Sequence, residues 1–155
     1  MTDQEKLAHK NKLKQYCHHF LNQRIAVSKA AIENAQESAS SEEKSSAGDK
    51  YETSRAMSHL EGDMHSRQLA ENVKELSALH GINTNIIYQL ITSGALVKCD
   101  GISFFVAIGI GKQTIDGEMI WFLSPGAPLA KRMEHKKAGD TFIFSGKETL
   151  IAEVY

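Results

Sequence analysis

Apolar residues in the first half of the chain recur at helical spacing. Residues 1–47 contain neither glycine nor proline, and good helix formers (Lys, Gln, Glu, Ala and Leu) dominate. A second run, with a slip in its register after Met64, begins at about Tyr51. The pattern predicts two amphipathic helices, each with a heptad-like apolar stripe. The stripe positions are Leu13, Tyr16, Phe20, Val27 and Ala31 in the first helix, and Met57, Leu60, Met64, Leu69, Val73 and Leu76 in the second.

A polar segment at residues 38–48 joins the two predicted helices. Neither helix can bury its stripe alone, so we expect an antiparallel hairpin over residues 1–80 in which the two stripes pack against each other. Some 30 residues per helix predict a hairpin of roughly 45 Å. The serine and glycine content of residues 38–48 lowers helix propensity, and this explains the break.

The second half of the chain has the residue pattern of a small sheet domain. Runs of β-branched and aromatic residues are interrupted by Asp-Gly at 100–101 and 116–117, which are strong hairpin signals. We expect strands at residues 95–99, 102–110, 117–123, 140–145 and 148–154, and a short helix at 126–134. The sequence therefore predicts an α+β fold, with an antiparallel coiled-coil hairpin at 1–80 followed by a small antiparallel sheet with one short helix at 81–155.

Charge is unevenly distributed along the predicted hairpin. The net charge of −1 argues against a strong general attraction to nucleic acid or acidic membranes. Residues 1–32 are nevertheless mostly basic and residues 33–52 mostly acidic. The acidic side chains at the turn, residues 40–53, are Glu42, Glu43, Asp49 and Glu52. Such a cluster is either a solvated loop or a device that carries negative charge to a distant site.

The remaining composition bears on the cellular location and on the role of the cysteines. No run of about 18 apolar residues is present. The polar start, MTDQEKLAHKNKLK, lacks the apolar core of a secretion signal, so we expect a cytoplasmic protein with no membrane partner. Cys17 and Cys99 do not suggest a disulfide framework. Cys17 precedes His18 and His19, but adjacent helical residues point about 100° apart. Because no further ligand follows at zinc spacing, we expect Cys17 to pack inside and the histidines to face solvent.

Two segments carry a resemblance to a known family. The first, Gly48-Asp49-Lys50-Tyr51-Glu52-Thr53, is similar to a tip motif of Gly-Asp, two residues and Glu-Asn. The second runs from Ser124-Pro125 through residues 127–132 to 136–140. It is similar to a segment in which Ser-Pro, a short helix, Gly-Lys and an acidic residue precede a terminal hairpin. The segment in this chain is a few residues longer. In this order, and over nearly the full chain, they resemble the bacterial Gre transcript-cleavage factors, which implies an FKBP-like second domain.

The resemblance implies an accessory factor rather than an enzyme with its own active site. In that family the globular domain docks on RNA polymerase and the hairpin enters the secondary channel. There the acidic tip helps the polymerase's own active site to cleave the 3′ end of backtracked RNA. The resemblance assigns this catalytic role to Asp49 and Glu52, which would hold Mg²⁺ only jointly with the polymerase; the free protein would bind no cofactor.

The resemblance also implies further contacts, and we expect the protein to be a monomer. Polymerase docking is assigned to Ser124 and Pro125 in the second domain. Contact with the nascent RNA is assigned to a basic face of the first helix, whose residues are Lys10, Lys14, His18 and Arg24. Such phosphate contacts would be salt-sensitive and sequence-blind. The alternative interpretation of this face is a solvated helix surface with interspersed charges.

Carboxylates at such a tip suit phosphodiester hydrolysis, which two cations assist by clamping the attacking and leaving oxygens. Mg²⁺ is often held by only one or two carboxylates, with water and phosphate completing the shell. Asp49 and Glu52 are three residues apart and would share a helix face. One of them could also orient or deprotonate the attacking water. The alternative is a capping box, with Asp49 as the N-cap and Glu52 completing it.

The chain departs from the family pattern at two positions beside the tip. Thr53 stands where the family has asparagine, and Arg55 where an acidic residue often follows. These differences leave open a second function, a regulator that occupies the polymerase channel without stimulating cleavage. A third possibility is a peptidyl-prolyl isomerase in which Trp121 floors the pocket of the FKBP-like domain, although this would leave the hairpin unexplained.

Overall fold

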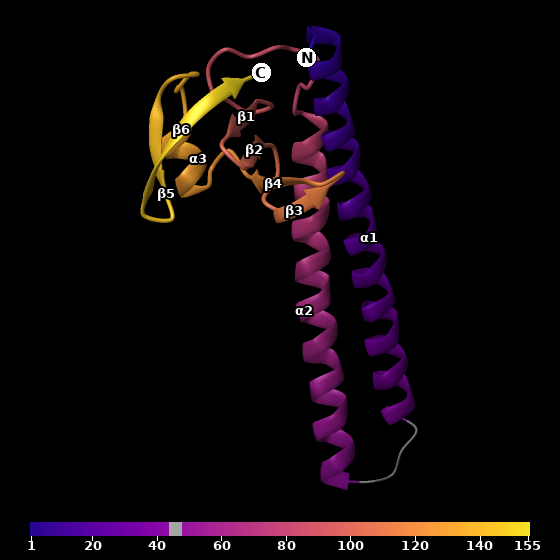
Figure 1. Ribbon diagram of the computed structural model, residues 1–155. Coiled ribbons are helices and arrows are strands. Elements are labelled where there is room, and N and C mark those ends of the chain that lie inside the picture. Colours follow the sequence, from indigo (N-terminus) through magenta and orange to yellow (C-terminus); the bar gives the residue numbers. More distant parts are fainter. Residues whose placement is uncertain (44–47) are drawn as a thin grey trace. The chain divides into compact units, whose positions relative to one another are not determined.

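Two long helices precede a sheet domain (Figure 1). The computed structural model of the protein describes the backbone of residues 1–43 and 48–155 and the side chains of residues 1–40 and 52–155. The helices are α1 (Asp3–Glu43), α2 (Gly48–His80) and α3 (Pro128–Met133). The strands are β1 (Leu96–Cys99), β2 (Ile102–Val106), β3 (Gly111–Ile115), β4 (Glu118–Leu123), β5 (Thr141–Phe144) and β6 (Lys147–Val154). The predicted α+β fold, with a helical hairpin followed by a sheet and one short helix, is confirmed.

The chain divides into two compact units. One unit, which we call the head, contains Met1–His18 and Ala78–Tyr155, so the first turns of α1 belong to the sheet domain. The other unit, the arm, contains His19–Ser77. Within the part of the chain that the structure describes, no helix is both long and apolar enough to span a bilayer.

Local signals explain where the long helices begin and end. At the start of α1, Thr2 and Glu5 form a reciprocal capping box: the Glu5 amide donates to Thr2 Oγ1 at 3.1 Å and the Thr2 amide donates to Glu5 Oε2 at 3.2 Å. The other end of α1 differs from the prediction, since the helix continues through the serines after residue 38 to Glu43. Serine lowers helix propensity only slightly and therefore does not by itself end a helix.

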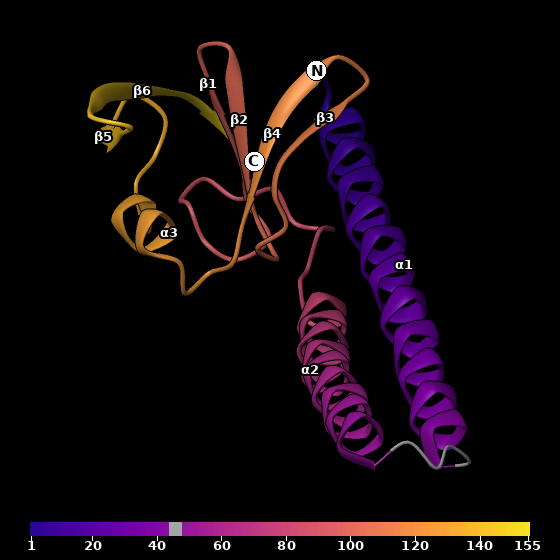
Figure 2. The ribbon, with the colours of Figure 1, turned by 90° about the horizontal axis from the view of Figure 1, so that it is seen from below.

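In the arm, α1 and α2 lie side by side (Figures 1 and 2). A Cβ added at Gly62 would lie 3.6 Å from the Ala35 Cβ, so the two backbones approach closely there. The buried positions of α1 in the arm are Leu21, Ser28, Ala35 and Ala39. Six of the partly buried positions of α2 follow a heptad spacing of 4, 3, 4, 3 and 4 residues: Ser58, Gly62, His65, Leu69, Asn72 and Leu76. Ser54, Arg55 and Glu75 are also partly buried.

The predicted packing of the two large apolar stripes is therefore only partly correct in the arm. Leu69 and Leu76 of the second stripe are half-buried, whereas other members of the two stripes are exposed. Val27 is 70% exposed, Leu60 65%, Met57 58% and Met64 44%. Val73 is also exposed, at 49%. At Ala35 and Gly62 the hairpin packs on small side chains, which let the two helices come closer than methionine or valine would allow.

The head contains one sheet of six strands, in the order β3-β4-β2-β1-β6-β5. All neighbouring strands are antiparallel except β2 and β4, which pair in parallel from Ser103↔Ile120 to Val106↔Leu123. The expected long strand at 102–110 ends at Val106, and a sixth strand, β3, follows it. β3 and β4 form the hairpin around Asp116 and Gly117, whose φ angles of 51° and 80° suit a two-residue turn. The sheet is therefore mixed rather than purely antiparallel.

The sheet is covered on both faces, which accounts for the continuous burial of Ser103 to Val106 in β2. On one face α3 contributes Ala130 and Met133 to a core that includes Phe104 and Phe142. On the other, the α1 side chain of Tyr16 stacks on Phe122 with ring centroids 5.9 Å apart. Leu13 and Cys17 of α1 are fully buried in the head. Parallel pairing of β2 with β4 fits this two-sided burial.

Candidate functional site

The acidic tip occupies the end of the arm where the two helices are connected. Gly48 begins α2, so positions 49 and 52 lie in its first turns and three residues apart on one helix face. Glu52 is exposed. The side chains of Asp49, Glu42 and Glu43 lie outside the described part, so pairing of the Asp49 and Glu52 carboxylates stays a prediction. Because α2 already includes Asp49, the backbone favours a carboxylate inside the first turn over a capping box with Asp49 as the N-cap.

Two lysines of the predicted basic face donate hydrogen bonds within the head. Lys10 is fully buried, its Nζ donates to the Ile86 carbonyl at 2.6 Å, and the ammonium lies 4.5 Å from the centroid of the Tyr88 ring. Lys14 Nζ donates to the Ile82 carbonyl at 2.6 Å. Both lysines thus tie α1 to the segment that connects α2 with β1. Lys10 is not available for the predicted contact with RNA phosphate, and we leave it out of that surface.

The other two residues of this face are exposed. His18 lies in the head, with its ring centroid 5.5 Å from that of His80. Arg24 lies in the arm, where its guanidinium is 4.5 Å from the centroid of the Phe20 ring. Helical spacing correctly indicated a polar face for these two positions, but it could not show which lysines would fold their aliphatic stems inward onto backbone carbonyls.

Burial lowers the pKa of Lys10 to about 8, so stability should depend on pH in a defined way. In the unfolded chain this amine titrates near 10.5, so between about pH 8 and 10.5 the unfolded state holds a proton that the folded state has released. The wild type should therefore gain stability relative to Lys10→Met as pH rises through this window, by up to about 1.4 kcal/mol per pH unit. Urea unfolding at several pH values measures this difference.

Lys29→Met, at an exposed position of α1, is the control for general lysine titration. If the stability difference between wild type and Lys10→Met did not grow above pH 8, or grew equally for Lys29→Met, the lowered pKa of Lys10 in the folded protein would be wrong.

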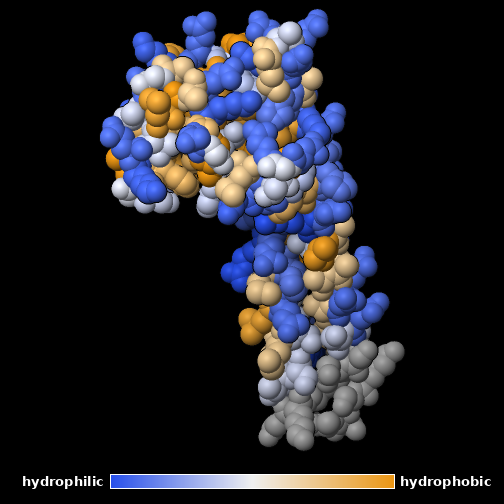
Figure 3. Space-filling model, viewed as in Figure 1, coloured by the Kyte–Doolittle hydropathy of each residue, from blue (hydrophilic) through white to orange (hydrophobic). Residues whose placement is uncertain are grey.

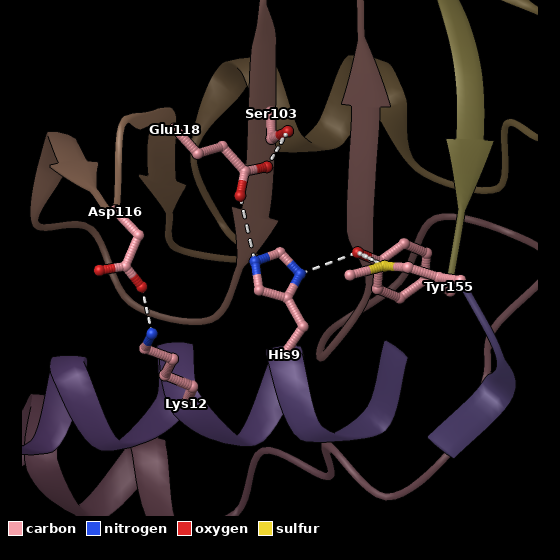
Figure 4. Close-up of polar contacts among 7 residues, drawn as sticks. His9, Lys12, Ser103, Asp116, Glu118 and Tyr155 are labelled. Carbon is pink, nitrogen blue, oxygen red and sulfur yellow. Dashed lines mark hydrogen bonds and ion pairs between the residues drawn. The ribbon is translucent and has the colours of Figure 1, made fainter. Parts of the chain in front are cut away.

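A polar network that the sequence did not indicate fastens α1 to the sheet of the head (Figure 4). His9 Nε2 lies 3.1 Å from Glu118 Oε2, and His9 Nδ1 lies 2.8 Å from the Tyr155 hydroxyl oxygen. Ser103 donates from Oγ to Glu118 Oε1 at 2.8 Å. Lys12 adds an ion pair with Asp116. These residues are up to 146 positions apart in the chain, so no local spacing could have revealed the network.

The order of groups in this network argues for a structural role. Glu118 stands between Ser103 and His9, so the imidazole accepts nothing from the serine hydroxyl and cannot activate it as a nucleophile. Burial, followed by the nearby Glu118 and Glu153 carboxylates, raises the pKa of Tyr155 well above its usual value and keeps the phenol neutral. The network therefore positions the first turns of α1 on the sheet.

The two cysteines are free and buried or half-buried. Burial raises the pKa of the Cys17 thiol to about 12 and that of the Cys99 thiol to about 11, so thiolates, the form that binds metal, are disfavoured. Cys17 packs inside, as the sequence predicted. Among the described side chains no group of three or more His, Cys, Asp or Glu residues is arranged to hold a metal ion.

The residues predicted for docking lie between β4 and α3. Ser124 is half-buried and Pro125 is exposed, and the Ser124 carbonyl accepts from the Ala127 amide at 3.0 Å just before α3. Their position leaves Pro125 accessible to a partner, and the docking role stays a prediction. Trp121, considered for an isomerase pocket, packs its ring edge-on against Phe144 with centroids 5.8 Å apart and contributes to the core.

Comparison of this chain with protein-family models, with curated proteins and with solved structures gives no match.

Proposed function

We propose that this protein is a transcription elongation factor that binds RNA polymerase and inserts its helical hairpin into the secondary channel. There it stimulates the polymerase's intrinsic cleavage of backtracked RNA. The head, as an FKBP-like domain, docks on the polymerase through a surface that includes Ser124 and Pro125. The protein acts in the cytoplasm and is not an enzyme by itself, since the polymerase supplies the active centre.

The observation that supports this proposal most is the start of α2. Positions 49 and 52 fall in the first turns of a long helix, next to the connection between the two helices, and Glu52 is exposed there. From His19 to Glu43, α1 alone extends about 40 Å in the arm at 1.5 Å per residue. A narrow two-helix element of this length can carry a carboxylate into a channel that a globular domain cannot enter.

The proposed mechanism requires only one or two carboxylate ligands from the tip. A polymerase active centre already holds one Mg²⁺, so a second ion needs only one or two additional carboxylate oxygens, with water and phosphate completing its shell. Asp49 and Glu52 supply these oxygens jointly with the polymerase, and the ion then stabilises the attacking or leaving oxygen. Lys14, His18 and Arg24 remain the candidates for contact with the nascent RNA, and such contacts would weaken as salt rises.

A second candidate function rests on Arg55. This residue is half-buried and lies three positions after Glu52 on the same helix, so its guanidinium reduces the negative field at the tip. A tip with weaker negative charge would hold a second Mg²⁺ less tightly. The protein would then occupy the channel and regulate the polymerase without stimulating cleavage.

The test is to add the purified protein to arrested elongation complexes of a bacterial RNA polymerase that carry 3′-labelled or 5′-labelled RNA. We expect Mg²⁺-dependent shortening of the RNA from its 3′ end, followed by resumed elongation. Binding to the polymerase without shortening, accompanied by slower elongation, would favour the second candidate. If the protein neither bound the polymerase nor changed RNA length, both functions would be wrong.

A further inference from the structure

A groove of ≈ 790 Å³ runs between the two helices of the arm. Its apolar lining comes from both helices: Phe20 and Val27 from α1, and Met64 from α2. Val27 and Met64 are 70% and 44% exposed, although they are the kind of side chain that usually forms a core. The groove therefore presents apolar surface that the arm itself does not cover.

The apolar surface extends beyond the groove along α2. Leu60 and Met57 precede Met64 by four and seven residues, which places all three on one face of the helix. Leu60 is 65% exposed and Met57 58% exposed. We call Val27, Met57, Leu60 and Met64, together with the groove, the outer stripe. Figure 3 shows apolar side chains on the arm within a largely hydrophilic surface.

The outer stripe has the spacing of a coiled-coil contact but is not the seam of the hairpin. Gly62 and Ala35 lie in that seam, and Gly62 is about half a turn away from Leu60 on α2. Steps of three and four residues, from Met57 to Leu60 to Met64, are the a and d positions of a heptad. An exposed apolar stripe at helical spacing, outside the seam of its own hairpin, can pack against further helices.

The charges of the groove indicate what kind of helices it receives. Arg24 and Arg67 line it together with Glu71 and Glu75, so the lining carries two positive and two negative side chains. Nucleic acid would meet two carboxylates, and a strongly basic or acidic protein would be repelled by one of the two pairs. A partner with an apolar stripe and both charge signs fits, and a second copy of this arm has these properties.

The size of the surface suits such a pairing. From residue 57 to residue 75, α2 extends about 28 Å, and two adjacent helices are about 20 Å wide. The projected face is thus roughly 600 Å². This is below the roughly 800 Å² that each partner buries in a standard interface and suits a weak, concentration-dependent dimer. Such an interface is self-complementary when the two copies are related by a two-fold axis.

We propose that the outer stripe is a self-association surface through which two copies of this chain pack their arms into an antiparallel four-helix bundle. This adds a concentration-dependent dimer to the monomer that the sequence predicts. The proposal does not depend on the transcription role, because it concerns the purified protein alone. Arg24 lines the groove, so the dimer and a contact of Arg24 with nascent RNA would exclude each other.

Sedimentation equilibrium of the full chain, from micromolar to several hundred micromolar, tests the proposal. The average mass of the wild type should rise from 17.1 kDa toward twice that value. Leu60→Glu introduces a charge at the centre of the outer stripe and should weaken the dimer by about tenfold or more, since an unpaired carboxylate would be buried. Leu60 is exposed in the single chain, so the variant should fold, and circular dichroism checks this.

Val73→Glu is the matched control on the same helix. Val73 is 49% exposed and lies nine residues after Met64, half a turn away from the outer stripe. It should leave the dimer unchanged, as should Leu150→Glu in β6 of the head, where the leucine is 57% exposed. A wild type that stays monomeric throughout would overturn the proposal. Equal weakening by Leu60→Glu and Val73→Glu would overturn the assignment to the outer stripe.

Discussion

Replacing Asp49 by asparagine, or Glu52 by glutamine, is expected to slow RNA cleavage in arrested elongation complexes by on the order of 100-fold, the size of a contribution from a positioned base or charged ligand. Both substitutions keep the size of the side chain and remove its charge. Glu52 is exposed at the start of α2, so its substitution has little to disturb in the fold. The measurement is the rate of RNA shortening on a denaturing gel at saturating protein.

The Mg²⁺ dependence of this rate separates two roles of the carboxylates. If a residue holds the second ion, its amide variant should need a higher Mg²⁺ concentration for half-maximal cleavage, and added Mg²⁺ should restore part of the rate. If the residue acts only as a base toward water, the Mg²⁺ midpoint should not move. The pH profile of the variant would change instead.

Asp63→Asn is the matched control, because Asp63 is an exposed carboxylate on the same helix, about 16 Å further along it than Glu52. It should cleave as the wild type does. All three variants should bind the polymerase with unchanged affinity in a competition assay, since docking is assigned to the head. Full cleavage activity with both Asp49→Asn and Glu52→Gln would remove the tip from the proposed mechanism.

The sequence predicted the helical hairpin well because its signals are local. Long runs of helix formers without glycine or proline need no tertiary information to be recognised. The Asp-Gly turns likewise marked the β1–β2 and β3–β4 hairpins, since their two-residue turns require positive φ at the glycine. The strand β3 was missed because its residues 111–115 are mostly polar and half-exposed, without the apolar run that marks a buried strand.

The packing of the arm could not be predicted from the same pattern. A pattern of large apolar side chains predicts that Met64 and Val27 lie between the helices, but both are exposed. The two backbones approach closely at Ala35 and Gly62. Which of two stripes becomes the seam depends on helix separation, a tertiary quantity that a single helix does not encode. The same limit explains Lys10, whose partner is a backbone carbonyl 76 residues away.

The role of the tip carboxylates could not be predicted from the sequence either. The acidic cluster was visible in the sequence, and the start of α2 at Gly48 places positions 49 and 52 on one helix face. Neither fact distinguishes a ligand of Mg²⁺ from a carboxylate that merely complements the helix dipole. That distinction depends on a partner molecule, so only an experiment with the polymerase resolves it.

Replacing Gly94 by alanine is expected to destabilise the head by about 3 kcal/mol, because two separate costs add. The backbone at Gly94 has φ +93°, a conformation that costs a residue with a Cβ about 1–2 kcal/mol. An added Cβ would also lie 2.5 Å from the carbonyl oxygen of Asn83 and 3.2 Å from Tyr88 Cε2. The oxygen belongs to backbone and cannot rotate away, so the segment connecting α2 with β1 would have to shift.

Two other glycines of the head separate these costs in urea unfolding. Gly101 has φ +73° but nothing within 4 Å of an added Cβ, so Gly101→Ala should lose only about 1 kcal/mol, from backbone strain. Gly126 has neither strain nor a close neighbour, and Gly126→Ala should be neutral or slightly stabilising. Equal losses for Gly94→Ala and Gly101→Ala would mean that the connecting segment yields freely. The contacts of Lys10 and Lys14 with its carbonyls, which we regard as its anchors on α1, would then contribute little to its position.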